Sequence, residues 1–187
     1  MKNFFIGVAM SAVALGAGAQ WAQEPTSVMG VELGGRREAI PPCPRGAAAF
    51  KSKTVCLESI AGNPAVGILW GLPLNFTRDG ANVNFVDGRV QLITFAVSRD
   101  QNYQRLKATL AERYGPAHMV ETAHVTANSG AVLSSEESTW GGPNVVIALS
   151  ERSGSIDRSV VIFGYLPLGE KKRRDDARDA KSNASKL

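Results

Sequence analysis

The clearest pattern along the chain is an alternation of apolar and polar positions between residues 81 and 97. Val83 and Phe85 alternate with asparagines, and Asp87-Gly88 is a strong signal for a tight turn. From residue 90 to residue 97 both alternating sets of side chains are largely apolar. The pattern predicts a hairpin whose second strand is central in a sheet and covered on both faces.

A helical period follows directly. Tyr103, Leu106, Leu110 and Tyr114 recur at steps of three and four, which places them on one stripe. Ser98 and Gln101 fit a capping box at the start, and Gly115-Pro116 fits a helix end. We expect a helix over residues 99–114 that packs on the sheet.

Short apolar segments separated by Gly, Pro and Asn occupy the rest of the chain. Before the hairpin, residues 29–33 alternate like a strand, and residues 66–74 fit either a strand edge or a packed loop. After the helix, turn signals separate four strand candidates, which favours an antiparallel meander over residues 118–127, 136–141, 145–150 and 159–165. The expected fold class is α+β, a mostly antiparallel sheet with one main helix on one face.

The first 19 residues have the features of a secretory signal peptide. Lys2 precedes an apolar run from Phe4, and small residues close it at Ala17-Gly18-Ala19. We expect cleavage after Ala19, with Ala22 as the alternative site. The run is shorter than the roughly 20 residues of a membrane-spanning helix, although an uncleaved anchor is the other interpretation. The mature protein is then periplasmic or secreted, with a flexible leader over 20–29, a single domain over 30–168 and a charged tail over 169–187.

The net charge of +4 is concentrated at the C-terminal end. Residues 170–187 carry seven basic and four acidic side chains, and Lys2 leaves with the signal peptide, so the remaining body is neutral. A neutral body does not attract a polyanion, so we expect no nucleic-acid partner.

The tail has almost nothing to bury. Its only apolar residues between 171 and 186 are alanines, so we expect it to be disordered or transiently helical. Its basic cluster either contacts anionic lipid headgroups, at about 1 kcal/mol per cation, or is simply solvated. That cluster is Lys171, Lys172, Arg173 and Arg174.

Cys43 and Cys56 are the two cysteines of the chain. In an oxidising compartment a lone pair in a small domain is typical of a structural disulfide. A redox role would favour a tighter Cys-x-x-Cys spacing, and zinc would need further ligands. His118 and His124 do not supply them, because six residues of strand separate them by about 20 Å. We therefore expect no metal.

No pattern of catalytic residues stands out, and we expect neither an enzyme nor a cofactor. A nucleophile elbow, a Ser-x-x-Lys pair and a nucleotide-binding loop are all missing from the sequence. Trp140 and Trp70 flank glycines, and each either contacts a partner or caps the core. A hydrolase with an unrecognised site is the third-ranked alternative.

Several of these segments together resemble a loose group of small bacterial exported proteins of unknown function. The resemblance lies in Gly30-Val31-Glu32-Leu33-Gly34, Pro42-Cys43-Pro44, Val86-Asp87-Gly88-Arg89-Val90 and the helix end at residues 110–116. It implies an exported α+β domain and no catalytic residues.

We therefore expect a non-catalytic binding module. Its partner would be an envelope protein, a peptide or a cell-wall component, bound through a sheet edge. The alternative is an envelope-associated accessory protein, whose basic tail provides peripheral contact with a membrane or an anionic partner.

Overall fold

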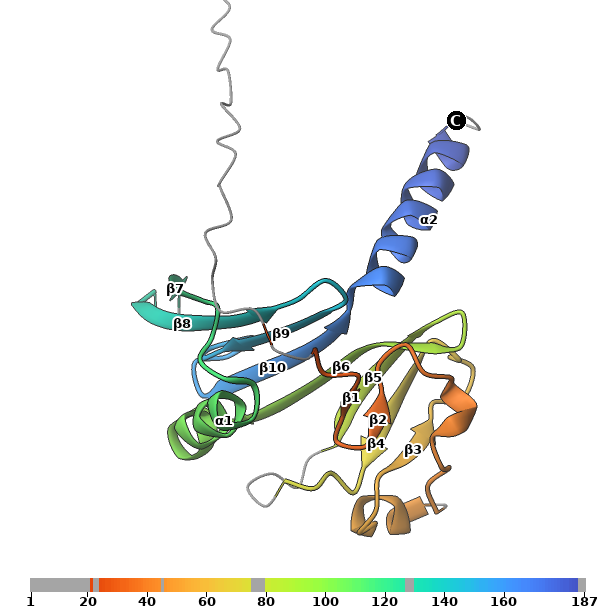
Figure 1. The fold of residues 1–187 in the computed structure, drawn as a ribbon, viewed down its shortest axis with the longest axis horizontal. Coiled ribbons are helices and arrows are strands. Elements are labelled where there is room, and N and C mark those ends of the chain that lie inside the picture. Colours follow the sequence, from red (N-terminus) through yellow and green to blue (C-terminus); the bar gives the residue numbers. More distant parts are fainter. Residues whose placement is uncertain (1–20, 22–23, 45, 75–79, 127–129, 185–187) are drawn as a thin grey trace, which may run out of the picture.

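The computed structural model describes residues 21, 24–44, 46–74, 80–126 and 130–184. The expected signal peptide and its cleavage site lie outside these residues. One large antiparallel sheet dominates the fold (Figure 1). Its eight strands run in the order β3-β4-β5-β6-β10-β9-β8-β7, which confirms the α+β class with a mostly antiparallel sheet. The strands are β3 (Cys56–Ser59), β4 (Val66–Trp70), β5 (Ala81–Val86), β6 (Arg89–Ser98), β7 (Met119–Thr126), β8 (Val132–Gly141), β9 (Val145–Ser150) and β10 (Arg158–Tyr165).

The core lies on one face of this sheet. Helix α1 (Arg99–Tyr114) and a small hairpin both cover that face, as Figure 1 shows. The hairpin consists of β1 (Ser27–Val28) and β2 (Val31–Glu32). Buried side chains from the sheet, the helix and the hairpin form one hydrophobic cluster. The sheet contributes Ile93, Phe95, Ile147, Leu149, Val161 and Phe163. Helix α1 contributes Tyr103, Leu106 and Leu110, and the hairpin contributes Val28 and Val31.

The prediction that the strand after Gly88 is covered on both faces was wrong. β6 is central, but Leu92 and Thr94, which point away from α1, are only partly buried. Apolar and β-branched side chains favour a central strand on either face, so an apolar pattern in both registers does not require two covering layers.

The main helix was predicted with its bounds, 99–114. Gly115 ends it with a positive φ of 81°, which glycine adopts without strain because it has no side chain. The capping box was not confirmed, because the Ser98 side chain makes no capping hydrogen bond. Instead the Arg99 amide donates to the Asp157 carbonyl at 2.8 Å, so the loop before β10 satisfies the start of the helix.

The described residues of the N-terminal leader contact the rest of the fold. The Trp21 ring lies 5.4 Å from the His118 ring, and Glu24 Oε1 accepts hydrogen bonds from the amides of Asn144 (2.8 Å) and Val145 (2.6 Å).

The strand expected over 29–33 is in fact the β1–β2 hairpin, which turns at Met29 and Gly30 with φ of 52° and 83°. A methionine in a left-handed position is uncommon, so the residue type at this position gave no signal for a turn.

The expected disulfide is present and joins Cys43 to Cys56. It holds the preceding segment beside β3, where the Leu57 amide donates to Pro41 O (2.8 Å) and the Cys43 amide donates to Leu57 O (3.0 Å). The β3 edge of the sheet is therefore covered by chain, which satisfies backbone groups that an edge strand would otherwise expose.

The C-terminal tail forms helix α2 (Leu166–Ala184), which projects from the end of β10 (Figure 1). Of the two alternatives expected for the tail, the described residues adopt the helical one. Ion pairs four residues apart stabilise the helix, Lys171 with Asp175 at 2.7 Å and Lys172 with Asp176 at 2.6 Å. Lys171 also contacts Asp87 at 2.8 Å, which fixes the start of α2 to the β5–β6 turn.

Within the described ranges, neither helix combines the length and apolar character of a bilayer-crossing segment.

Candidate ligand pocket

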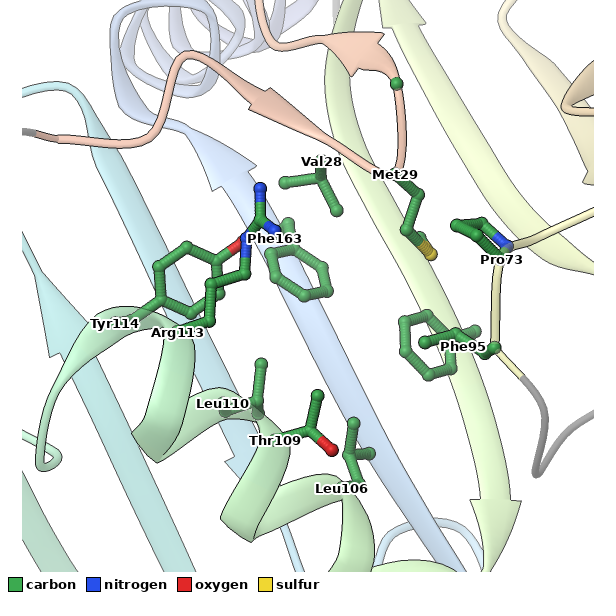
Figure 2. Close-up of a pocket in the computed structure, with 12 residues that line it drawn as sticks. Val28, Met29, Pro73, Phe95, Leu106, Thr109, Leu110, Arg113, Tyr114 and Phe163 are labelled. Atoms are coloured by element: carbon green, nitrogen blue, oxygen red, sulfur yellow. The ribbon is translucent and has the colours of Figure 1, made fainter.

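A cavity of about 550 Å³ opens between α1, the β1–β2 turn and the segment at Pro73-Leu74 (Figure 2). Strands β6 and β10 contribute its floor. This volume falls within the range of small-molecule sites, roughly 300–1,000 Å³. The pocket therefore lies on the core face of the sheet, where the two covering elements leave a gap.

The inner part of the pocket is apolar and rigidly packed. Phe95 and Phe163 stack with ring centroids 6.2 Å apart, and both are buried. Leu106 and Leu110 form the helix side, and Val28 forms the hairpin side. All five side chains belong to the buried core, so this wall is fixed by the packing of the fold itself.

The rim differs in exposure and composition. Met29 and Tyr114 are partly buried, whereas Pro73, Thr109 and Arg113 are exposed. Met29 is held over the pocket by its left-handed turn position, and its unbranched thioether adapts readily to different shapes. The pocket thus combines a preformed floor with an accessible, adaptable mouth.

Arg113 is the single charged residue among the described residues that line the pocket. Its guanidinium carbon lies 5.6 Å from the centroid of the Tyr114 ring, a cation–π arrangement that limits its movement. Figure 2 shows Arg113 reaching from α1 toward Phe163 and Val28. Thr109, the other polar side chain on this helix wall, already donates to the Arg105 carbonyl at 2.8 Å.

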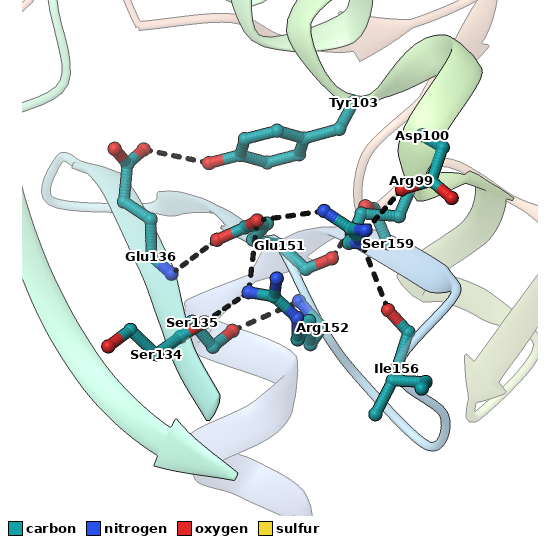
Figure 3. A network of polar contacts seen from close by, with 10 residues as sticks. All are labelled: Arg99, Asp100, Tyr103, Ser134, Ser135, Glu136, Glu151, Arg152, Ile156 and Ser159. Atoms are coloured by element: carbon teal, nitrogen blue, oxygen red, sulfur yellow. Dashed lines mark hydrogen bonds and ion pairs between the residues drawn. The ribbon is translucent and has the colours of Figure 1, made fainter. Parts of the chain in front are cut away.

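Apart from the pocket, a cluster of polar side chains links α1 to β8 (Figure 3). The carboxylate of Glu136 accepts hydrogen bonds from Tyr103 Oη (2.7 Å) and Ser138 Oγ (3.0 Å), and pairs with Lys107 Nζ at 2.6 Å. Partial burial by itself would raise the pKa of Glu136, but the hydrogen bonds from Lys107, Tyr103 and Ser138 outweigh it and lower the pKa. Burial and the adjacent Glu136 carboxylate raise the pKa of Tyr103.

The cluster continues through Glu151 to β9 and the start of α1. Glu151 Oε2 accepts from the Glu136 amide at 3.1 Å, and Glu151 Oε1 lies 3.0 Å from Arg152 and 3.4 Å from Arg99. Figure 3 shows these groups directed at one another. Because each carboxylate is matched by donors from neighbouring elements, the cluster joins α1 to the sheet and we assign it a structural role.

The lowered pKa of Glu136 predicts a pH dependence of stability. A carboxyl group whose pKa is lower in the folded state stabilises the fold above its unfolded pKa, about 4.3, and loses this contribution as pH falls through the folded pKa. We expect Glu136→Gln to be less stable than wild type at pH 7, with the difference shrinking below about pH 4. Urea unfolding at a series of pH values measures this, and a constant difference across the series would contradict it.

The tryptophans singled out from the sequence lie away from the pocket. Trp140 is 1% exposed, and its Nε1 donates to the Gly115 carbonyl at 2.8 Å. A partner cannot reach this side chain, so the core interpretation replaces the partner-contact interpretation. Trp70 is partly buried and donates from Nε1 to Glu58 Oε2 at 2.6 Å. It points away from the core face, because its neighbour Leu69 is fully buried there.

The basic cluster of the tail is largely paired with acids of its own helix. Lys171, Lys172 and Arg174 each lie within 4.0 Å of an acidic side chain. These pairs reduce the field that the cluster presents to an anionic surface. Contact of the tail with a membrane stays a prediction.

The sheet edge expected to bind a partner has a clear counterpart in β7. This strand is eight residues long and ends the sheet, and Met119 and Val120 are 49% and 55% exposed. Binding at this edge also stays a prediction.

Sequence reasoning did not find the pocket. Its residues come from the β1–β2 turn, the segment after β4, α1, β6 and β10, which only the fold brings together. One signal was present in residues 66–74, an apolar segment interrupted by Gly and Pro that fitted either a strand or a packed loop. Its first part is strand β4, and Pro73-Leu74 is a loop that lines the pocket.

Comparison with known proteins gives no relatives: no protein-family model, no curated protein and no solved structure matches this chain.

Proposed function

We propose that this protein is an exported, non-catalytic binding protein that takes the apolar part of a small ligand into the pocket between α1 and the β1–β2 turn. The observation that carries the proposal is the buried apolar floor beneath an exposed rim. Ligand sites commonly have this composition, in which apolar walls supply affinity and a few polar groups supply orientation.

Two further observations support the proposal. The Cys43–Cys56 disulfide fits an oxidising compartment, which agrees with the signal-like first 19 residues. The titratable cluster around Glu136 and Glu151 does not line the pocket, and its groups pair with one another. The pocket thus has the composition of a binding site and is not built around that cluster.

A matched pair of substitutions on α1 tests the proposal. Thr109 and Ala108 are adjacent and exposed, but only Thr109 lines the pocket. We expect wild type to bind the neutral fluorescent probe N-phenyl-1-naphthylamine saturably. Thr109→Trp should obstruct the mouth and weaken this binding at least about ten-fold, whereas Ala108→Trp should bind like wild type.

Fluorescence titration measures the affinity, and circular dichroism with thermal melting verifies that both variants are folded. Absence of saturable binding to wild type would overturn the proposal. Equal weakening by both substitutions would overturn the assignment of binding to this pocket.

A further inference from the structure

We infer that the ligand is a single-chain amphiphile with an anionic head, specifically a free long-chain carboxylic acid whose carboxylate pairs with Arg113. This inference rests on the proposed function and names the class of ligand that the pocket takes. It is carried by the placement of one cation, Arg113, at one end of a cavity whose other lining residues are uncharged and mostly apolar.

The charge of the lining selects the head group. Arg113 is the one charged residue among the described lining residues, and no described acid lies within ion-pair distance of it. A guanidinium stays protonated and presents a planar fork of donors that matches the two oxygens of a carboxylate. The pocket therefore favours an anion over a cation.

The position of Arg113 orients the ligand. In Figure 2, Arg113 and Tyr114 mark one end of the pocket, while Met29, Pro73 and Phe95 mark the other. Phe163 lies between these ends. A carboxylate at Arg113 would thus send an alkyl chain across Phe163 toward Phe95 and Met29.

The rings and aliphatic side chains along this path suit an alkyl chain. Phe95, Leu106 and Leu110 line this path with apolar atoms, so an alkyl chain laid along it exchanges water for an apolar environment. Met29 sits at the far end, where a flexible thioether can adjust to chains of different length. A chain without an acid would fill the same path but leave the Arg113 guanidinium to water.

A series of ligands that differ only in their head group tests the inference. Dodecanoate, dodecanol and dodecylamine are titrated separately against wild type loaded with N-phenyl-1-naphthylamine, below their aggregation thresholds. We expect dodecanoate to displace the probe about three- to five-fold more tightly than dodecanol, the gain that an ion pair at an exposed rim allows. Dodecylamine should bind most weakly.

Substitutions at Arg113 should then change the preference without removing binding of the chain. Arg113→Gln should lose the advantage of dodecanoate while dodecanol binds as before, and Arg113→Glu should favour dodecylamine. Arg105→Gln is the control, because Arg105 is exposed on the same helix but does not line the pocket. It should keep the wild-type order.

The outcomes separate this inference from the proposed function. Equal affinity of wild type for dodecanoate and dodecanol would overturn the head-group inference and leave apolar binding intact. A preference for dodecanoate that survives in Arg113→Gln would overturn the role of Arg113. Displacement by none of the three ligands, with no saturable binding of the probe, would overturn both.

Discussion

Replacing Trp140 with alanine is expected to lower the free energy of unfolding by about 3–5 kcal/mol, the usual cost of deleting a large buried aromatic side chain. Trp140 is among the most buried large side chains of the described core, at 1% exposure, and it contacts the core from β8. The alanine variant loses the apolar contacts of the indole and leaves a cavity that rigid neighbours fill only in part.

The indole also holds the end of α1. Its Nε1 donates to the carbonyl of Gly115, the residue that follows Arg113 and Tyr114 at the mouth of the pocket. Trp140→Phe should therefore cost less, about 1–3 kcal/mol, because most of the packing remains while the carbonyl loses its partner. We also expect this variant to bind N-phenyl-1-naphthylamine more weakly than wild type, since the end of α1 is less firmly placed.

Equilibrium urea unfolding measures both changes, with Trp70→Ala as the control. Trp70 is only partly buried, so its replacement should cost clearly less than that of Trp140. If Trp140→Ala lost less than about 1 kcal/mol, the core role assigned to this residue would be wrong.

Local signals explain which parts of the fold were predictable. The helix over 99–114 combines an apolar stripe with Gly115-Pro116, and all of this information lies within one short stretch. The hairpin around Asp87-Gly88 is equally local, and its turn residues have the expected left-handed backbone. Each prediction needed only neighbours in sequence.

Long-range pairing explains much of what was missed. β10 pairs with β6, so that Val161 faces Phe95 across more than sixty residues of chain. No local pattern specifies this strand pairing, yet it creates the pocket floor, because Phe163 stacks on Phe95 only when β10 and β6 are adjacent. In the sequence, Arg113 is simply a basic residue in the last turn of a helix.

The tail is a different case, because its sequence carries signals both for disorder and for a helix. Lys171 and Asp175, like Lys172 and Asp176, are spaced four residues apart, which is the spacing that stabilises a helix. Composition alone indicated disorder, since the segment buries little. Charge spacing and the contact of Lys171 with Asp87 account for the helix.

Removing the Cys43–Cys56 disulfide is expected to lower the free energy of unfolding by about 3 kcal/mol, because the bond closes a short loop and restricts the unfolded chain. The two cysteines are separated by 13 residues in sequence. For a protein of this size the loss corresponds to a decrease of about 6–12 °C in melting temperature. The suitable variant is Cys43→Ala with Cys56→Ala, since Cys56 is buried and alanine adds no polar atom there.

Reduction of the wild-type protein provides the matched comparison. Treatment with a phosphine reductant should lower the melting temperature of wild type to about that of the double alanine variant, and should leave the variant unchanged. The reduced protein should also scatter more light on heating, because the segment at Pro41 then detaches more easily from the β3 edge and exposes its backbone groups. A reduced wild type that melts within about 2 °C of the oxidised protein would show that the fold does not depend on this bond.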